Sequence, residues 1–321
     1  MIETKSMNDT PTLIVVAGPT ASGKTALGIE LAKKYGGEIV SADSMQIYRG
    51  MDIGTAKASR EEQASAVHHM LDVAAPDENY SVARYAEEAA HCCEDIFARG
   101  KVPVITGGTG LYIDALLSGV TFGARDEDLS LREKLNAEYD AAGGVEMLRR
   151  LSEFDPERAA ILHAADKKRI VRAFEVYLLS GETITEHDRK TKLIPPRYDS
   201  FFIIPGYRER SLLYKRIDDR VDTMVSAGLF EEVERLLSSG VPENATSMQA
   251  IGYKEAVLAL KGEVCREEAV EMIKQASRRY AKRQLTWFAR RTEALRLYND
   301  DPGGPEEAIR VAISRAKEQL K

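Results

Sequence analysis

The sequence lacks several features that mark specialised classes of protein. It has 3 cysteines in 321 residues, and Cys92, Cys93 and Cys265 include no pair with the spacing of a zinc or redox motif. No apolar run approaches the roughly 20 residues that span a bilayer, and the polar start of the chain lacks the apolar core of a signal peptide. We therefore expect a reduced cytoplasmic protein with no structural zinc site and no membrane segment.

The chain also lacks the net positive charge that is typical of nucleic-acid-binding proteins. Its formal net charge of −6 argues weakly against such a partner. The basic residues nevertheless gather in two segments, KKRIVR at residues 167–172 and RRYAKRQLTWFARR at residues 278–291. Because local clusters determine affinity for a phosphate backbone more than net charge does, nucleic acid remains a possible partner.

A phosphate-binding loop is the most informative motif that is present. The apolar residues 13–17 break into GPTASGKT, which continues into the amphipathic segment ALGIELAKKYG. A strand, G-x-x-x-x-G-K-T and a helix in this order are typical of a P-loop, in which backbone N–H groups, the helix N-terminus and a lysine surround a phosphate. The threonine can bind magnesium. The expected diphosphate or triphosphate site consists of Gly18, Pro19, Thr20, Ala21, Ser22, Gly23, Lys24 and Thr25.

Two further strand ends are expected near this loop. Residues 38–42 form a short apolar strand that ends at Asp43, and VPVITGGTGLYIDALL repeats the order of strand, glycine-rich turn and helix, with Thr109 in the turn. Ligands of parallel sheets bind at the carboxyl ends of the strands, so Asp43 is expected beside the P-loop, although it could instead cap the following segment. The second strand has no terminal aspartate of the kind that helps ATPases and GTPases hold magnesium, which argues against a simple NTPase.

The pattern changes between residues 122 and 196, where charged helical segments follow one another without strand-like runs. The buried-strand segment FFIIP then follows, and most of the remaining chain is helical. We predict an α/β fold: a P-loop NTPase-like parallel sheet flanked by helices, built from residues 1–121 and 197–321, with a helical insertion domain at residues 122–196. Arg210 begins the helix after FFIIP, and its guanidinium could bind a diphosphate with two parallel hydrogen bonds.

Taken together, the motifs resemble those of the tRNA dimethylallyltransferases, also called tRNA isopentenyltransferases. The resemblance is carried by GPTASGKT, SADSMQIYRGMDIGTAK, HHMLD, ITGGTGLY, KKRIVRAFEVY, the spacing of Arg210, Arg216 and Arg220, and QAIGYKE, in family order. Eukaryotic members of the family carry a C-terminal zinc finger. This sequence has no such Cys/His spacing, and in this respect it resembles the bacterial type. The resemblance implies transfer of a dimethylallyl group from dimethylallyl diphosphate to the N6 amine of an adenosine beside the tRNA anticodon, with Mg²⁺ assisting.

The resemblance also implies roles for individual residues. The P-loop would hold a diphosphate where other P-loop proteins bind ATP, with Lys24 and Arg210 neutralising its charge and Thr25 binding Mg²⁺. Asp43 would accept the amine proton, Thr109 would orient the amine, and the insertion would grip the anticodon stem-loop of tRNA. The protein is expected to act as a monomer. The implied tRNA contacts are Asp43, Ser44, Met45, Gln46, Thr109, Arg132, Lys167, Lys168, Arg169, Ile170, Val171, Gln249, Gly252, Tyr253 and Lys254.

Three alternatives stay open from the residues alone. A small-molecule P-loop kinase would use Asp43 as a base and ATP as donor, but would leave the insertion unexplained. An isopentenyltransferase acting on free adenine nucleotides would not need the insertion either. A nucleotide-gated RNA-binding module would use the basic segments but would give Asp43 no task.

Overall fold

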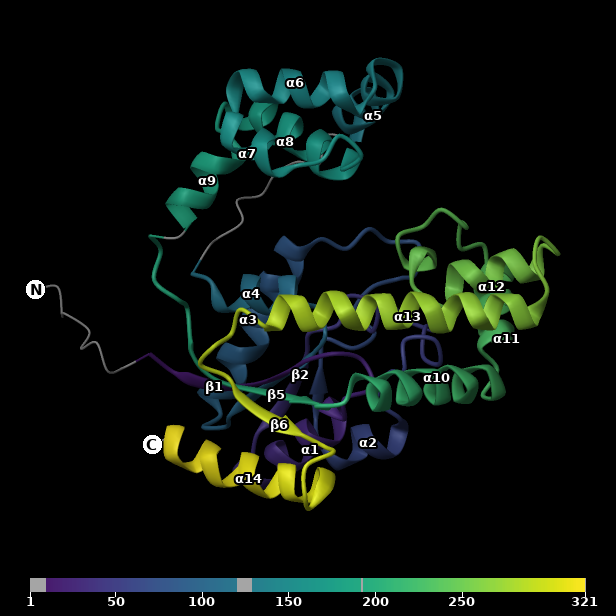
Figure 1. Cartoon of the computed structure of the whole chain (residues 1–321). Helices are drawn as coiled ribbons and strands as arrows, with labels where there is room; N and C mark the ends of the chain where they lie inside the picture. The colour runs from purple at the N-terminus through teal and green to yellow at the C-terminus, as the bar shows by residue number, and fades with distance from the viewer. Residues whose placement is uncertain (1–9, 120–128, 192, 321) are drawn as a thin grey trace, which may run out of the picture. The chain divides into compact units, whose positions relative to one another are not determined.

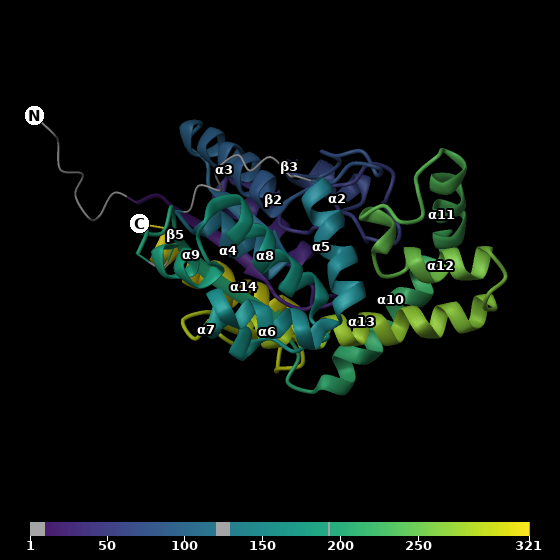
Figure 2. The same ribbon diagram turned by 90° about the horizontal axis from the view of Figure 1, so that it is seen from above.

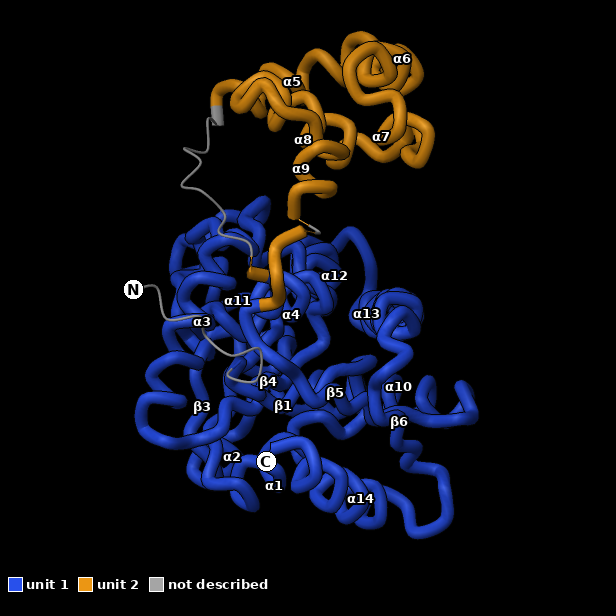
Figure 3. Tube along the Cα trace, turned by 90° about the vertical axis from the view of Figure 1, so that its left-hand side faces the viewer, with its two compact units in different colours: residues 1–118, 197–321 blue, residues 119–196 orange. Residues whose placement is uncertain are grey.

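A computed structural model describes residues 10–119, 129–191 and 193–320 of the chain. It divides into two compact units, residues 1–118 with 197–321 and residues 119–196, which Figure 3 colours separately. The expected start of the insertion at residue 122 lies outside the described residues.

Unit 1 is built on one parallel sheet of six strands in the order β3-β2-β4-β1-β5-β6. Every strand pairs in parallel with its neighbours. The expected fold class is therefore confirmed. The strands are β1 (Thr12–Ala17), β2 (Glu38–Ser41), β3 (His68–His69), β4 (Pro103–Gly107), β5 (Asp199–Gly206) and β6 (Leu295–Tyr298).

Helices and one 3₁₀ turn accompany this sheet in two groups. The first group is α1 (Lys24–Tyr35), α2 (Arg60–Ser65), α3 (Val82–Ala98) and α4 (Gly110–Leu117). The group after β5 is α10 (Arg210–Ser226), α11 (Leu229–Ser238), η1 (Ser247–Gln249), α12 (Tyr253–Leu260), α13 (Arg266–Phe288) and α14 (Gly304–Gln319). Figures 1 and 2 show α12 beside α13, and α11 packs against α12.

Alternate residues of β1 pack against opposite faces of the sheet. Leu13 and Val15 join the large core that includes residues of α3 and α4, whereas Ile14 and Val16 pack with α1 and α14. Figure 1 shows α1 and α14 on one side of the sheet and α3, α4 and α13 on the other. Because both faces are covered, all four side chains are fully buried and the strand reads as a continuous apolar run.

Unit 2 consists of helices with a small core of their own. Met147, Leu151 and Ile170 are fully buried in this core, and the rings of Phe154 and Tyr177 stack with centroids 4.2 Å apart. The helices are α5 (Leu129–Ala142), α6 (Gly144–Phe154), α7 (Pro156–Ile161), α8 (Lys167–Ser180) and α9 (Ile184–Thr191). Within the described ranges of both units, no helix has the length and apolar character needed to cross a membrane.

Candidate active site

The phosphate loop joins the buried end of β1 to the start of α1. Gly23 precedes the helix with a φ of 84°, a left-handed conformation that favours glycine. Lys24 follows, and its Nζ donates to the carbonyl oxygen of Pro19 at 2.6 Å. Burial, followed by the positive charge of Arg220, lowers the pKa of Lys24 to about 7, while Asp43 acts in the opposite direction. The loop therefore presents a partly desolvated ammonium group that gains from a bound anion.

The arginines that α10 contributes to this loop are Arg216 and Arg220. Both line the cavity that surrounds the P-loop, and Arg216 Nε donates to the carbonyl oxygen of Ala21 at 3.4 Å. Arg210 is exposed at the first position of α10 and lines neither cavity of the site. The helical period accounts for this difference, since positions 216 and 220 are four residues apart on one face of α10 and position 210 lies on another.

Asp43 and Thr109 come together between the ends of β2 and β4. Asp43 Oδ1 accepts a hydrogen bond from the Met45 backbone N–H at 2.9 Å. The Thr109 hydroxyl oxygen accepts from the Ser44 backbone N–H at 3.0 Å. The Thr109 N–H in turn donates to the Ala42 carbonyl at 3.1 Å, so the two loops are bound to each other on both sides of Asp43.

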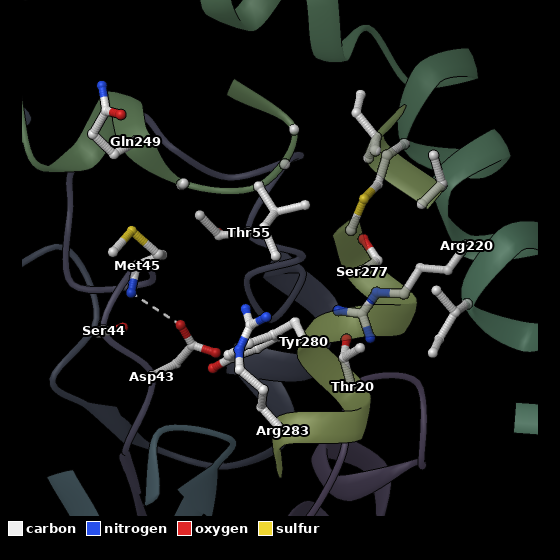
Figure 4. A pocket seen from close by; sticks show the side chains of 18 residues that line it. Thr20, Asp43, Ser44, Met45, Thr55, Arg220, Gln249, Ser277, Tyr280 and Arg283 are labelled. Carbon is white, nitrogen blue, oxygen red and sulfur yellow. Dashed lines mark hydrogen bonds between the residues drawn. The ribbon is translucent and has the colours of Figure 1, made fainter. Parts of the chain in front are cut away.

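Two adjoining cavities meet at Asp43. The first, of about 560 Å³, is lined by the P-loop, the glycine turn after β4 and the α10 arginines. The second, of about 270 Å³, is lined partly by apolar side chains, including Val221, Met224 and Ile273. Figure 4 shows Asp43 with Tyr280 and Arg283 in the second cavity. The residues that line both cavities are Thr20, Asp43, Thr55, Arg220 and Tyr280.

The donor set of the first cavity fits a magnesium ion that is held mainly by substrate phosphates. Thr25 lines this cavity, and the described residues include no cluster of three or more His, Cys, Asp or Glu that could hold a metal. Magnesium commonly keeps several waters and binds few protein ligands together with phosphate oxygens. Ser22 and Thr106 are among the residues that line the same cavity, and their hydroxyl oxygens are buried with no hydrogen-bond partner within the described chain.

The sequence analysis missed the contribution of α13 to the site. Tyr280 lines both cavities, Arg283 lines the second, and the buried Gln284 lines the first. Burial, followed by the charge of Asp43, raises the pKa of Tyr280 to about 12. The i, i+4 spacing of Tyr280 and Gln284 is the sequence signal for this contribution, because it places both side chains on one face of the helix. The many cations of the same segment make this spacing less conspicuous.

Several expected tRNA contacts of unit 1 have internal partners. Gln46 Nε2 donates to the carbonyls of Thr55 and Ala56, each at 3.2 Å. Tyr253 is fully buried, and its hydroxyl donates to Glu232 at 2.5 Å. Gln46 and its partners Thr55 and Ala56 line the first cavity, whereas Tyr253 lines neither cavity.

Other expected contacts lie at the cavity or on the surface. Ser44, Met45, Gln249 and Gly252 line the second cavity. Lys254 is exposed.

In unit 2, the expected contacts divide into surface and core positions. Arg132 binds the buried Glu175 through two hydrogen bonds of 3.0 and 3.2 Å. Lys167 pairs with Asp140 at 2.6 Å.

The next four residues of the same segment, 168–171, differ in exposure. Lys168 and Arg169 are exposed. Ile170 is fully buried in the core of unit 2, and Val171 is also buried. The exposed cations are therefore the side chains of this segment that are open to a partner.

A parallel sheet, a P-loop with two arginines opposite it and a carboxylate at the neighbouring strand end define a P-loop α/β protein with a site for a phosphorylated ligand. A family model described as "IPP transferase" matches residues 46–291, and one described as "Isopentenyl transferase" matches residues 11–76. The chain belongs to the IPP transferase family.

Individual relatives agree with this assignment over most of the chain. A tRNA dimethylallyltransferase of Caldanaerobacter subterraneus subsp. tengcongensis is 46% identical over 277 residues, covering 86% of this chain and 88% of the relative. The crystal structure of a tRNA delta(2)-isopentenylpyrophosphate transferase from Staphylococcus epidermidis is similar with a TM-score of 0.69 and 41% identity, covering 97% and 98% of the two chains. A eukaryotic dimethylallyltransferase acting on tRNA has a TM-score of 0.82 and 28% identity, covering 97% of this chain and 80% of that one.

Proposed function

We propose that this protein transfers the dimethylallyl group of dimethylallyl diphosphate to N6 of an adenosine beside the anticodon of tRNA, releasing diphosphate. The observation that carries the proposal is the position of Asp43, which lines both the phosphate cavity and the partly apolar cavity beside it. A base at this junction lies where a nucleophile can meet carbon that is still bonded to a diphosphate.

The leaving diphosphate is bound by the first cavity. Lys24, Arg216 and Arg220 line it, and their charges stabilise the negative charge that develops as the bond between carbon and oxygen breaks. The electron pair of that bond leaves with the diphosphate. Arg210, which is exposed, has no part in this step.

Asp43 takes the proton that the amine loses. The N6 lone pair forms the new bond to carbon, the nitrogen becomes cationic, and the carboxylate of Asp43 accepts the proton to leave a neutral secondary amine. Thr109 fixes the loop that carries Asp43 through its bond to the Ser44 N–H. The reacting carbon and nitrogen are thereby held in one orientation.

Magnesium is the proposed metal of the first cavity, with Thr25 as its protein ligand. When bound, it polarises the diphosphate oxygens and lowers the barrier to their departure.

The tRNA substrate requires recognition beyond this cavity. A base that is stacked in an anticodon loop must be flipped out before its amine can reach Asp43. Lys168 and Arg169 on α8 offer exposed cations for the RNA backbone, and we propose that unit 2 grips the anticodon stem-loop with them. We also propose that the protein acts in the cytoplasm as a monomer.

A substrate panel tests the proposed function. The protein is incubated with dimethylallyl diphosphate, Mg²⁺ and one of unmodified tRNA, AMP or ATP, and alkyl transfer is followed by mass spectrometry. We expect transfer to tRNA and none to either nucleotide. Transfer to AMP alone, or hydrolysis of ATP without alkyl transfer, would contradict the assignment.

A further inference from the structure

The side-chain amide of Gln284 bridges two loops that are remote from it in sequence. Its Oε1 accepts from the Thr20 N–H of the phosphate loop at 2.8 Å. Its Nε2 donates to the Gly108 carbonyl oxygen at 3.0 Å, in the glycine turn after β4. The side chain is 4% exposed, so water does not compete freely for these groups.

The two loops carry the two halves of the proposed reaction. Thr20 belongs to the loop that binds the leaving diphosphate. Gly108 directly precedes Thr109, whose hydroxyl accepts from the Ser44 N–H next to Asp43. One amide is therefore hydrogen-bonded both to the leaving-group loop and to the turn whose next residue holds the base in place.

The geometry permits only one orientation of this amide. Turning it over would place NH₂ against the Thr20 N–H and the amide oxygen against the Gly108 carbonyl, so both contacts would become repulsive. A Cβ at position 108 would lie 2.2 Å from Nε2, which explains why the turn has glycine there. Tyr280, one turn earlier on α13, lines both cavities.

We propose that Gln284 is a positioning residue, which holds the phosphate loop and the glycine turn at a fixed separation so that Asp43 stays aligned with the leaving diphosphate. This inference rests on the proposed function, and it adds a residue of α13 that acts through the two loops it bridges. Misplacement of reacting groups by about 1 Å can lower a rate by roughly 10²-fold. The expected loss is therefore in turnover.

Two substitutions separate this role from simple packing. Gln284→Met keeps the length of the side chain and removes both hydrogen bonds. Gln284→Glu keeps the acceptor for Thr20 N–H, but can donate to the Gly108 carbonyl only when it is protonated.

The pH dependence of the glutamate variant is therefore informative. Burial and the nearby Asp43 raise the pKa of an introduced carboxyl group, while Lys24 and Arg220 on the same cavity lower it, and Tyr280 stays neutral below its own raised pKa. Protonation restores the missing donor. The turnover of Gln284→Glu relative to the unsubstituted protein should rise as the pH falls.

The experiment measures single-turnover alkyl transfer to tRNA at saturating dimethylallyl diphosphate and Mg²⁺, together with tRNA affinity and thermal unfolding. Gln275→Met is the matched control, because Gln275 is an exposed glutamine on the same helix. We expect Gln284→Met to lower kcat by roughly 10²-fold with little change in tRNA affinity, and Gln275→Met to change neither.

Several outcomes would overturn the proposal. A normal kcat for Gln284→Met, or a loss confined to KM, would show that the bridge does not align the reaction. If Gln284→Met does not fold, the pH series of Gln284→Glu decides, and a ratio independent of pH contradicts the proposal. If the unsubstituted protein transfers no dimethylallyl group to tRNA, that result contradicts the proposed function rather than the positioning role of Gln284.

Discussion

Two basic helices that look alike in sequence have different places in the structure. In α8, Lys168 and Arg169 are exposed, and Ile170 is fully buried in the small core of unit 2. In α13, the face with Tyr280 and Gln284 lines the cavities, while Lys282 is exposed. The cations of a basic run can therefore lie on the solvent side of a helix, as in α8, or at a cavity, as Arg283 does in α13, and the position of each side chain determines whether it serves binding or chemistry.

This comparison separates two kinds of variant. Changes at the cavities of unit 1 should alter the rate of transfer with tRNA binding retained. Changes at the exposed cations of α8 should alter tRNA binding with the chemical step retained.

The largest effect is expected for Asp43→Asn. The amide keeps the size of the side chain but accepts no proton, and loss of a general base typically costs about 10²–10⁴ in rate. Single-turnover transfer is measured beside tRNA affinity, with Asp77→Asn, which lines neither cavity, as the control. A near-normal rate would mean that another group takes the proton.

The next effect is expected for Arg220→Ala. Loss of one charge that stabilises the developing diphosphate should lower kcat by roughly 10²-fold, comparable to the loss of one oxyanion-stabilising donor. Arg210→Ala is the matched control on the same helix and should leave kcat unchanged, since Arg210 is exposed and lines neither cavity. A lower kcat for Arg210→Ala with an unchanged kcat for Arg220→Ala would instead support the diphosphate-binding role that the resemblance implies for Arg210.

A smaller effect is expected for the double substitution Lys168→Gln with Arg169→Gln. Removing two exposed cations should weaken tRNA binding by roughly tenfold and reduce its salt slope by about 1 for each phosphate that is no longer neutralised. The single-turnover rate at saturating tRNA should not change. An unchanged salt slope, or a slower chemical step, would contradict the assignment of tRNA binding to α8 and of the chemical step to the cavities that α13 lines.

The smallest effect concerns the pH dependence of ligand binding. The pKa of Lys24 is about 7, and a bound diphosphate raises it, so the protonated form binds more tightly. Binding of dimethylallyl diphosphate should therefore weaken as the pH rises through 7, by about fivefold between pH 7 and pH 8. Lys24→Met should lose this dependence in a calorimetric titration, whereas the exposed Lys34→Met should keep it. A pH-independent affinity in the unsubstituted protein would contradict the role of Lys24.

Local signals were sufficient to predict much of the fold and the centre of the site. The apolar runs of β1, β2, β4 and β5 and the phosphate loop depend on the residues of each segment and its neighbours. The position of Asp43 followed from the rule that ligands bind at the carboxyl ends of parallel strands. The helical character of most of the chain after β5 was also expected.

Long-range contacts account for what the sequence did not reveal. Gln284 lies 264 residues from Thr20, and no local pattern connects a helix near the end of the chain with a loop near its start. β3, with two residues, is too short for a periodic signal. Which face of α10 meets the phosphate loop, and therefore whether Arg210 or Arg220 lies at the cavity, also depends on tertiary packing.

The most direct test of the central claim identifies the bond that breaks. Dimethylallyl diphosphate labelled with ¹⁸O at the oxygen bridging carbon and phosphorus is incubated with the protein, Mg²⁺ and unmodified tRNA, and both products are analysed by mass spectrometry. The account predicts that the tRNA gains an unlabelled dimethylallyl group and that all of the label leaves in the diphosphate. Label in the modified tRNA, or phosphate transferred to it, would contradict a reaction in which the phosphate loop holds a leaving group and carbon is the atom attacked.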